Sequence, residues 1–254
     1  MKSLCQLRFL DYTIVAGSIG ACCDDIVESI KTTTKPRRFA CLNPHSHVIA
    51  NDDPAFLDAL QAADWLVPDG AGVVLASSFL GSPVHERITG SDVFYGLHER
   101  LNRQGRCSIF FLGSTDEVLN EIRQRMTMDF PNLRVVGTFS PPYKPEFTPE
   151  ELDKMITAIN AVKPDVLWVG MTAPKQEKWI YQNRHRLQVK FIGAIGAVFD
   201  FYTGRVKRSH PIYQKLGLEW LPRLVQEPRR LWRRMGVSAP IFIWDVLKAK
   251  ISGN

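Results

Sequence analysis

Short apolar runs alternate with longer segments of helical period from about residue 36 to residue 200. This alternation is typical of a mostly parallel β-sheet covered by helices, so we predict an α/β fold. The predicted strands are residues 38–42, 65–68, 107–112, 133–137, 165–170 and 190–195. The predicted helices are residues 24–32, 54–63, 70–80, 91–104, 115–129, 149–162 and 175–187.

Polar clusters follow three of the predicted strands, at the point where each strand ends. They are Asn43-Pro44-His45, Pro68-Asp69-Gly70 and Ala173-Pro174-Lys175-Gln176-Glu177. The last of them carries a cation, an amide and a carboxylate, which a simple connection does not need. Because open α/β sheets hold ligands outside the carboxyl ends of their strands, we expect the three clusters to converge on a ligand site.

Length and composition limit the class of protein. A chain of 254 residues with 45% hydrophobic content can form one large α/β domain, or a domain with an appendage. Its five cysteines are odd in number and follow no metal spacing, which favours reduced thiols in a cytoplasmic protein. No stretch approaches the ~20 apolar residues of a spanning helix, and Asp11 interrupts any signal-peptide core. We expect a soluble or peripheral protein.

Positive charge gathers at the carboxyl end. Residues 205–250 hold eleven basic and three acidic residues, a net charge of +8, whereas the whole chain carries +6. The strand and helix alternation also stops after Gly204. We therefore predict a core of residues 1–204 and a basic, helical, aromatic-rich appendage of residues 205–254.

Tryptophans are interleaved with arginines in this appendage, including Trp220, Trp232 and Trp244. Such a mixture suits an anionic bilayer surface. The alternative is a helix hairpin that packs on the core and turns a solvated basic face outward, and both descriptions can hold at once.

Several short motifs occur along residues 39 to 235. They are Asn43, Pro68-Asp69-Gly70, Glu86-Arg87, Gly90-Ser91-Asp92, Val136-Gly137-Thr138, the Ala173–Glu177 pentapeptide, Gly193 to Gly204, Val206-Lys207-Arg208, Leu216 to Leu221, Arg223 and Glu227-Pro228. In their order and spacing, these motifs resemble the WecG/TagA/CpsF family of bacterial glycosyltransferases. The resemblance implies a Rossmann-like core whose appendage helps to complete the site.

The resemblance also implies a reaction. A sugar of the hexose or N-acetylhexosamine type would move, with inversion, from a UDP-sugar to a polyprenyl-diphosphate-linked saccharide at the cytoplasmic face of the bacterial inner membrane. Family members serve the synthesis of teichoic acid linkage units, common antigen, capsule and exopolysaccharide. The implied partners are the two substrates and an anionic membrane surface, without nucleic acid, while a homo-oligomer is left open.

Asp69 is the candidate general base, because inverting transfer needs a group to take the proton of the attacking hydroxyl. Gly70, next to it, lets substrate approach the backbone closely and is counted with the substrate-binding residues. The alternative for Asp69 is a helix N-cap, a role compatible with catalysis. Asn43 is the second catalytic candidate through the resemblance, and its alternative role is a bond to local backbone.

The other substrate-binding candidates come from the resemblance. Arg87 could hold phosphate oxygens, or it could form a surface ion pair with Glu86 or Asp92. Gln176 could form hydrogen bonds with sugar hydroxyls. Lys175 and Glu177 rank lower, because they could pair with each other or cap a helix. The remaining candidates are Cys41, Tyr143 for the uracil ring, Asp200 for a sugar hydroxyl, and Arg223, Arg229 and Arg230 for the diphosphate.

Cys41 stands where the teichoic acid type of the family has threonine, and Pro44-His45 replaces a small residue followed by a carboxylate. The donor sugar is therefore not assigned. A thiol at the end of a buried strand is otherwise a small apolar filler, and we do not expect a nucleophile.

No Asp-x-Asp motif occurs, so we expect no metal site and no cofactor. His45 and His47 lack a third ligand of suitable spacing for zinc. A Rossmann-type oxidoreductase is a weaker alternative, because no Gly-x-Gly-x-x-Gly motif follows an early strand. A noncatalytic polyanion-binding protein is the other alternative, and its binding would depend steeply on salt.

Overall fold

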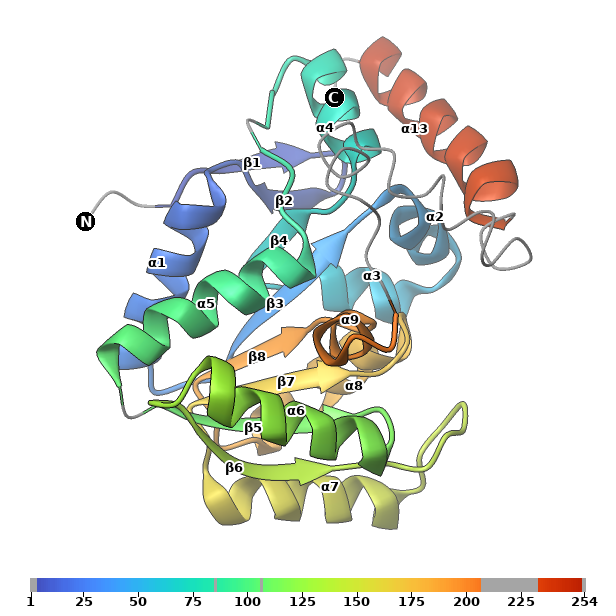
Figure 1. The fold of residues 1–254 in the computed structure, drawn as a ribbon. Coiled ribbons are helices and arrows are strands. Elements are labelled where there is room, and N and C mark those ends of the chain that lie inside the picture. The colour runs from blue at the N-terminus through green and yellow to red at the C-terminus, as the bar shows by residue number, and fades with distance from the viewer. Residues whose placement is uncertain (1–3, 85, 106, 207–232, 253–254) are drawn as a thin grey trace.

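The computed structural model describes residues 4–84, 86–105, 107–206 and 233–252, and it has the predicted α/β fold (Figure 1). Six parallel strands form the central sheet in the order β4-β3-β8-β7-β5-β6. Their bounds are β3 (Arg37–Leu42), β4 (Trp65–Pro68), β5 (Ser108–Gly113), β6 (Arg134–Phe139), β7 (Val166–Gly170) and β8 (Phe191–Ala194). All six predicted strands are confirmed to within a few residues. Strands β4, β5, β7 and β8 are nearly continuous apolar runs, as buried parallel strands require, whereas the edge strand β6 is only half-buried.

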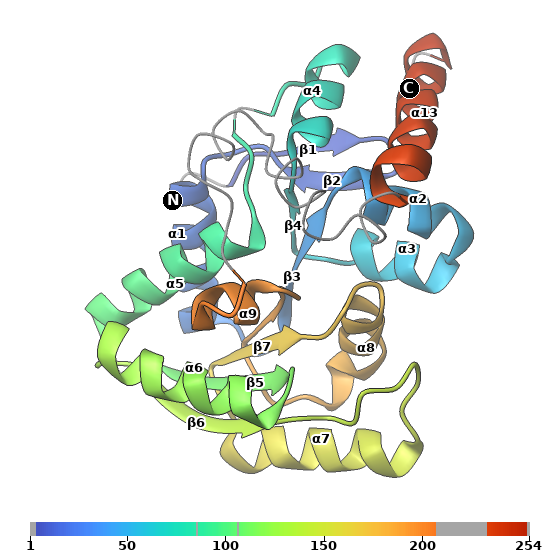
Figure 2. The same ribbon diagram turned by 45° about the vertical axis from the view of Figure 1, so that its right-hand side comes forward.

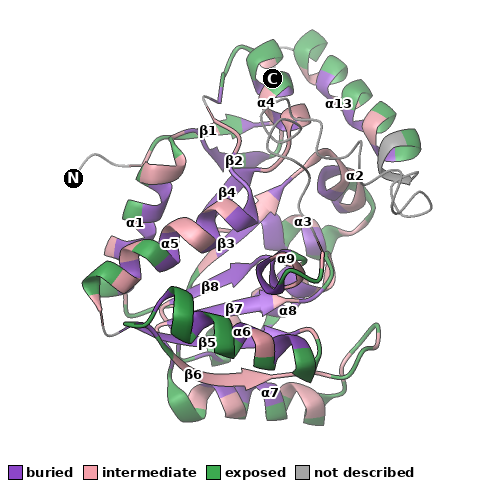
Figure 3. Ribbon diagram, viewed as in Figure 1, coloured by how far each residue is buried: buried purple, intermediate pink, exposed green. Residues whose placement is uncertain are grey.

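Helices cover both faces of the sheet (Figure 2). One apolar cluster joins the sheet to α1 (Ile19–Thr32), α5 (Gly90–Gln104), α6 (Asp116–Asp129) and α9 (Val198–Thr203). On the other face, two clusters join it to α3 (Pro54–Gln61), α7 (Pro149–Val162) and α8 (Lys175–Asn183). The helices alternate buried and exposed residues, as their 3.6-residue period predicts (Figure 3).

Four short elements were not predicted. Strands β1 (Gln6–Phe9) and β2 (Tyr12–Val15) form an antiparallel hairpin, whose turn places Leu10 at φ 50°. Leucine is an unusual residue for that left-handed conformation, so no turn signal announces the hairpin. The other two are α2 (Pro44–Asp52) and α9, and both are short. Helix α1 begins at Ile19, earlier than predicted, because Ser18 caps it.

The polypeptide returns to the core at its carboxyl end. A π-helical turn (Arg233–Ser238) leads into α13 (Ala239–Ser252), which packs on α2 and on α4 (Ala71–Leu80). Asp245 accepts hydrogen bonds from His47 Nε2 at 3.1 Å and from Asn51 Nδ2 at 2.9 Å. Phe242 is buried, with its ring centroid 5.5 Å from that of His47. In the described residues, no helix has the length and apolar character needed to cross a bilayer.

Candidate active site

Four neighbouring strands end at the same edge of the sheet. Strands β4, β3, β8 and β7 are consecutive in the sheet and parallel, so their carboxyl ends form one rim. Asp69 follows β4, Asn43 follows β3, Gln176 follows β7, and Asp200 lies in α9 after β8. Helices α8 and α9, which follow the neighbouring strands β7 and β8, pack on opposite faces of the sheet. Such a point in an open α/β sheet is where ligands bind in this class of fold. The predicted convergence of the polar clusters on one edge is confirmed.

Asp69 lies at the start of the turn between β4 and α4. Its backbone N–H donates to the carbonyl of Leu42 at 2.8 Å, which ties the turn to the end of β3. The N-cap of α4 is Gly70 at φ 108°, and this cap has no side-chain hydrogen bond. Asp69 is therefore not the N-cap of α4, and this partly exposed residue lies at the rim.

Asn43 binds local backbone, which is the alternative role predicted for it, and it caps α2. Its Oδ1 accepts from the backbone N–H of Ser46 at 2.9 Å, and its own N–H donates to Ser46 Oγ at 2.8 Å. This capping box begins α2. Because the cap uses only Oδ1, the side-chain amide nitrogen takes no part in it.

Three acidic groups of the rim act electrostatically on the Cys41 thiol. Burial raises the pKa of the Cys41 thiol well above its ordinary value, and the negative charges of Asp69, Glu177 and Asp92 raise this pKa further. These three carboxyls come from different connections of the sheet. The thiol stays protonated at neutral pH, which agrees with a filler rather than a nucleophile.

Gln176 joins two loops of the rim. Its Oε1 accepts from the backbone N–H of Gly196 at 3.0 Å, while its Nε2 donates to Glu177 Oε1 at 2.9 Å. The side chain is buried, so the start of α8 is fixed to the β8–α9 loop, which leads into the helix that carries Asp200. Lys175 points elsewhere, toward the carbonyl of Lys144 and the ring of Phe147.

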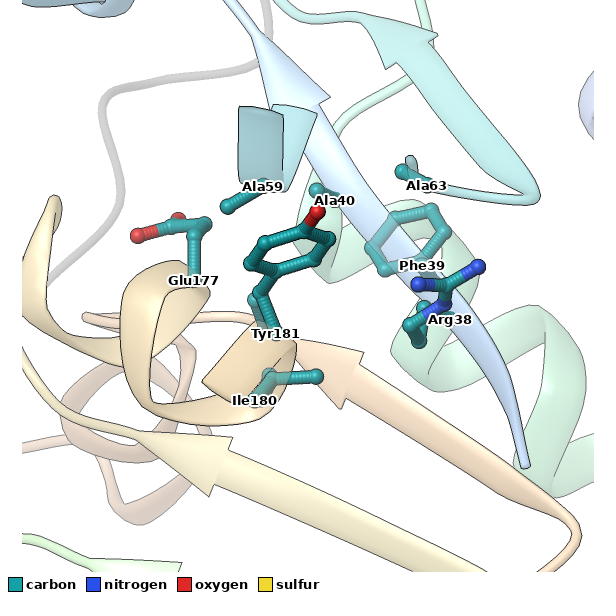
Figure 4. A pocket seen from close by; sticks show the side chains of 9 residues that line it. Arg38, Phe39, Ala40, Ala59, Ala63, Glu177, Ile180 and Tyr181 are labelled. Atoms are coloured by element: carbon teal, nitrogen blue, oxygen red, sulfur yellow. The ribbon is translucent and has the colours of Figure 1, made fainter. Parts of the chain in front are cut away.

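Glu177, expected to be a weaker substrate-binding candidate than Gln176, differs from the other carboxyls of the rim in its burial. It is a buried carboxyl, and burial raises its pKa to about 7. Among the described residues, its Oε2 has no hydrogen-bond partner. It also lines a small cavity between α8, α3 and the strands β3 and β8, beside Ala59 and Tyr181 (Figure 4). Its position in the pentapeptide was the only signal for it in the sequence.

The remaining candidates are spread more widely. Arg87 is partly exposed, and the next residue, Ile88, donates its N–H to the carbonyl of Pro68 at 3.1 Å, so Arg87 lies near the end of β4. Tyr143 is fully exposed and follows β6. Strand β6 is the outermost strand on the side of the sheet away from β4. The structure thus does not bring Tyr143 to the rim. Arg223, Arg229 and Arg230 lie outside the described residues.

Glu86 and Asp92, the acidic residues near Arg87 in the sequence, form hydrogen bonds at the starts of helices. Glu86 Oε2 accepts from the backbone N–H of Ile19 at 2.8 Å, at the start of α1. Asp92 forms a capping box with Thr89 at the start of α5. No group of three side chains that could hold a metal ion occurs in the part of the chain that the structure describes.

A parallel sheet with a polar rim at this edge is the architecture of many nucleotide-dependent enzymes, and comparison with known proteins identifies the class as glycosyl transferase. The chain belongs to the glycosyl transferase WecG/TagA/CpsF family, whose model matches residues 7–254.

Three relatives carry the name N-acetylglucosaminyldiphosphoundecaprenol N-acetyl-beta-D-mannosaminyltransferase. The protein of Bacillus spizizenii is 32% identical, covering 97% of this chain and 91% of the relative. That of Staphylococcus aureus strain MW2 is 30% identical, covering 89% and 87%. That of Bacillus subtilis strain 168 is 32% identical, covering 82% and 77%.

Proposed function

We propose that this protein transfers an N-acetylhexosamine-type sugar, with inversion, from a UDP-sugar to a saccharide linked to polyprenyl diphosphate. The reaction would take place at the cytoplasmic face of the bacterial inner membrane. The names of the relatives favour N-acetylmannosamine as the transferred sugar and N-acetylglucosaminyl-diphosphoundecaprenol as the acceptor. Family membership favours this function over the oxidoreductase and the polyanion-binding protein.

One observation carries the proposal. A carboxylate, Asp69, stands at the end of a buried strand beside a glycine whose φ of 108° leaves the backbone open, on a rim shared with Asn43 and Gln176. An inverting transferase needs such a group within hydrogen-bond reach of the acceptor hydroxyl. A partly exposed carboxylate can meet a hydroxyl from solvent, which a buried one cannot.

The chemistry then runs in one step. The oxygen of the acceptor hydroxyl attacks the anomeric carbon while the bond from that carbon to the diphosphate oxygen breaks. The hydroxyl proton passes to Asp69, and the bonding electron pair leaves with UDP. Attack from the side opposite UDP inverts the anomeric centre.

The departing diphosphate needs neutralisation. Arg87 is the candidate in the core, and the Asp69 side of the rim is otherwise acidic, with Asp92 and Glu177 nearby. We propose that residues 205–254, as an appendage to the core of residues 1–204, add Arg223, Arg229 and Arg230. Guanidinium groups hold phosphate oxygens through paired hydrogen bonds and so stabilise the charge that develops on UDP.

Asn43, Gln176 and Asp200 would position the donor. The capping box holds the Asn43 side chain in one orientation, and the Gln176–Gly196 bond holds the β8–α9 loop. In this proposal Gln176 orients the loop that leads into α9, and the carboxylate of Asp200 in α9 would accept from a sugar hydroxyl. Cys41 would line the donor pocket, and Tyr143 would contact the uracil ring only if its loop turned inward.

Transfer to a defined acceptor tests the function. Purified protein is incubated with a synthetic short-chain lipid carrying diphosphate-linked N-acetylglucosamine, and with UDP-N-acetylmannosamine, UDP-N-acetylglucosamine, UDP-glucose or UDP-galactose in turn. We expect one disaccharide product from UDP-N-acetylmannosamine, detected by mass spectrometry. Transfer from UDP-glucose or UDP-galactose alone would refute the choice of sugar, and transfer from no UDP-sugar would refute the function.

A further inference from the structure

The outer face of α13 is apolar although nothing described covers it. Ile243, Trp244, Leu247 and Ile251 are between 40 and 86% exposed, and they recur at spacings of three and four residues. Such spacing places them on one side of the helix. Phe242 and Val246, on the opposite side, are buried against the core. The helix is therefore apolar on two faces, and the described part of the chain covers one of them.

Charge is arranged around the outer face in a consistent way. With 3.6 residues per turn, Lys248 and Lys250 fall on opposite borders of the apolar face. The only acidic residue of α13 is Asp245, and it is turned inward to His47 and Asn51. Lys248 Nζ lies 5.4 Å from the ring centroid of Trp244. An apolar face with lysines at both borders and no exposed acid fits a surface of anionic lipid headgroups.

Helix α4 continues this exposed apolar face beside α13. Leu75 and Phe79, one helical turn apart, are 70% and 49% exposed, and Lys250 Nζ lies 5.6 Å from the ring centroid of Phe79. Helices α4 and α13 lie side by side at the end of the molecule farthest from β6 and α7 (Figure 1). Both show exposed residues along their length there (Figure 3).

We propose that α4 and α13 together form the surface by which this protein lies on an anionic bilayer, with Leu75, Phe79, Ile243, Trp244, Leu247 and Ile251 inserted among the lipid headgroups. The proposal rests on the lipid-linked acceptor of the proposed function. Its new element is the core helix α4, which the basic appendage alone would not include.

The position of α4 connects the surface to the site. The helix begins directly after Asp69 and Gly70, and its ten residues span about 15 Å. Phe79 and Asp69 are thus separated by no more than about that distance along the helix. A bilayer that holds Leu75 and Phe79 brings the diphosphate of a membrane-embedded acceptor close to the rim.

Vesicle binding tests the surface. Sedimentation of the full-length protein with vesicles of phosphatidylcholine, with and without phosphatidylglycerol, measures the partition coefficient. Leu75→Ser with Phe79→Ser should lower the coefficient at least tenfold, and Trp244→Ser with Ile251→Ser should do the same. Met128→Ser is the matched control, because Met128 on α6 is also 70% exposed but lies away from this surface. It should bind as the wild type does.

A charge variant adds a second comparison. Lys248→Glu with Lys250→Glu should weaken binding to the vesicles that contain phosphatidylglycerol and leave binding to pure phosphatidylcholine unchanged. Circular dichroism melting of each variant shows that it is folded. Wild-type vesicle binding by the folded Leu75/Phe79 variant would overturn the proposal.

The oligomeric state and the turnover on a soluble acceptor provide two further tests. A wild-type dimer that the same substitutions convert to monomers, without any change in vesicle binding, would make this face an interface between copies and overturn the proposal. Turnover on the short-chain soluble acceptor separates the surface from the function. Variants that lose vesicle binding but keep this turnover support the surface, whereas a wild type without turnover refutes the proposed function and not the vesicle result.

Discussion

Asp69 and Glu177 are two acidic residues of the rim that differ in their exposure to solvent. Asp69 is partly exposed at a strand end, whereas Glu177 is buried between α8 and the sheet. A residue that is partly exposed at the rim can be reached by a substrate hydroxyl. A buried carboxyl favours its neutral form, because burial withdraws the water that stabilises the charge.

Asp69→Asn tests the general base. The amide keeps the shape of the side chain but cannot accept the proton, so turnover should fall by roughly 10²–10⁴ while UDP binding stays nearly constant. Product formation and calorimetric UDP titration measure the two quantities. Asp153→Asn on α7, away from the rim, is the control. A variant with near-normal turnover would rule out Asp69 as the base.

Glu177 should make stability depend on pH. Its pKa rises from an ordinary value of 4.5 to about 7 on folding, so the folded state binds the proton more tightly. The free energy of unfolding should therefore fall between pH 4.5 and pH 7 and be lower above that window, by up to about 3 kcal/mol.

Glu177→Gln removes the titration and keeps an oxygen that can accept from Gln176 Nε2. We expect the variant to retain at pH 8 the stability that the wild type loses, with urea unfolding at several pH values as the measurement. Parallel stability curves for the two proteins would show that the pKa of Glu177 is ordinary.

At the scale of elements, the site depends on how short helices begin. Asn43 starts α2, and α2 in turn contacts α13 through His47 and Asp245. The capping residue thus supports the packing of the carboxyl-terminal helix as well as the rim. A capping side chain typically contributes about 1 kcal/mol to stability.

Asn43 substitutions separate capping from substrate binding. Asn43→Ala should lower the free energy of unfolding by about 1 kcal/mol, because the N–H of Ser46 loses its acceptor. Asn43→Asp restores the acceptor and should restore stability, whereas turnover should stay low because the amide nitrogen is gone. If Asn43→Asp regains full turnover, Asn43 acts only through the cap.

At the scale of the molecule, the core and the carboxyl-terminal segment are proposed to complete one site. Arg223→Ala removes a guanidinium assigned to the departing diphosphate, so turnover on a soluble short-chain acceptor should fall at least tenfold. Vesicle binding should remain. Lys35→Ala, an exposed cation before β3, is the control. Unchanged turnover of Arg223→Ala would limit the segment to attachment.

Metal removal tests how the leaving group is neutralised. Because arginines are assigned this task, turnover should persist in excess EDTA. Activity that EDTA abolishes, and that magnesium or manganese restores where sodium or potassium does not, would reveal a metal requirement.

Prediction from sequence succeeded where a residue's environment follows from its neighbours in the chain. Val166–Gly170 is apolar throughout and is a central strand, and Asp69 and Asn43 follow such strands, so their common edge could be inferred. The β1–β2 hairpin could not, because its strands have four residues each and Leu10 forms the turn. The role of Gln176 was also hidden, since Gly196 is distant in the chain.

The sequence by itself determined the class of fold, the edge that carries the polar clusters and the basic carboxyl end, because each depends on local pattern and composition. Only the tertiary structure decided which carboxyl is buried, that Gly70 rather than Asp69 caps α4, and that α4 and α13 share an exposed apolar face. Burial, hydrogen bonding and surface continuity arise from contacts between distant segments, and no local pattern specifies such contacts.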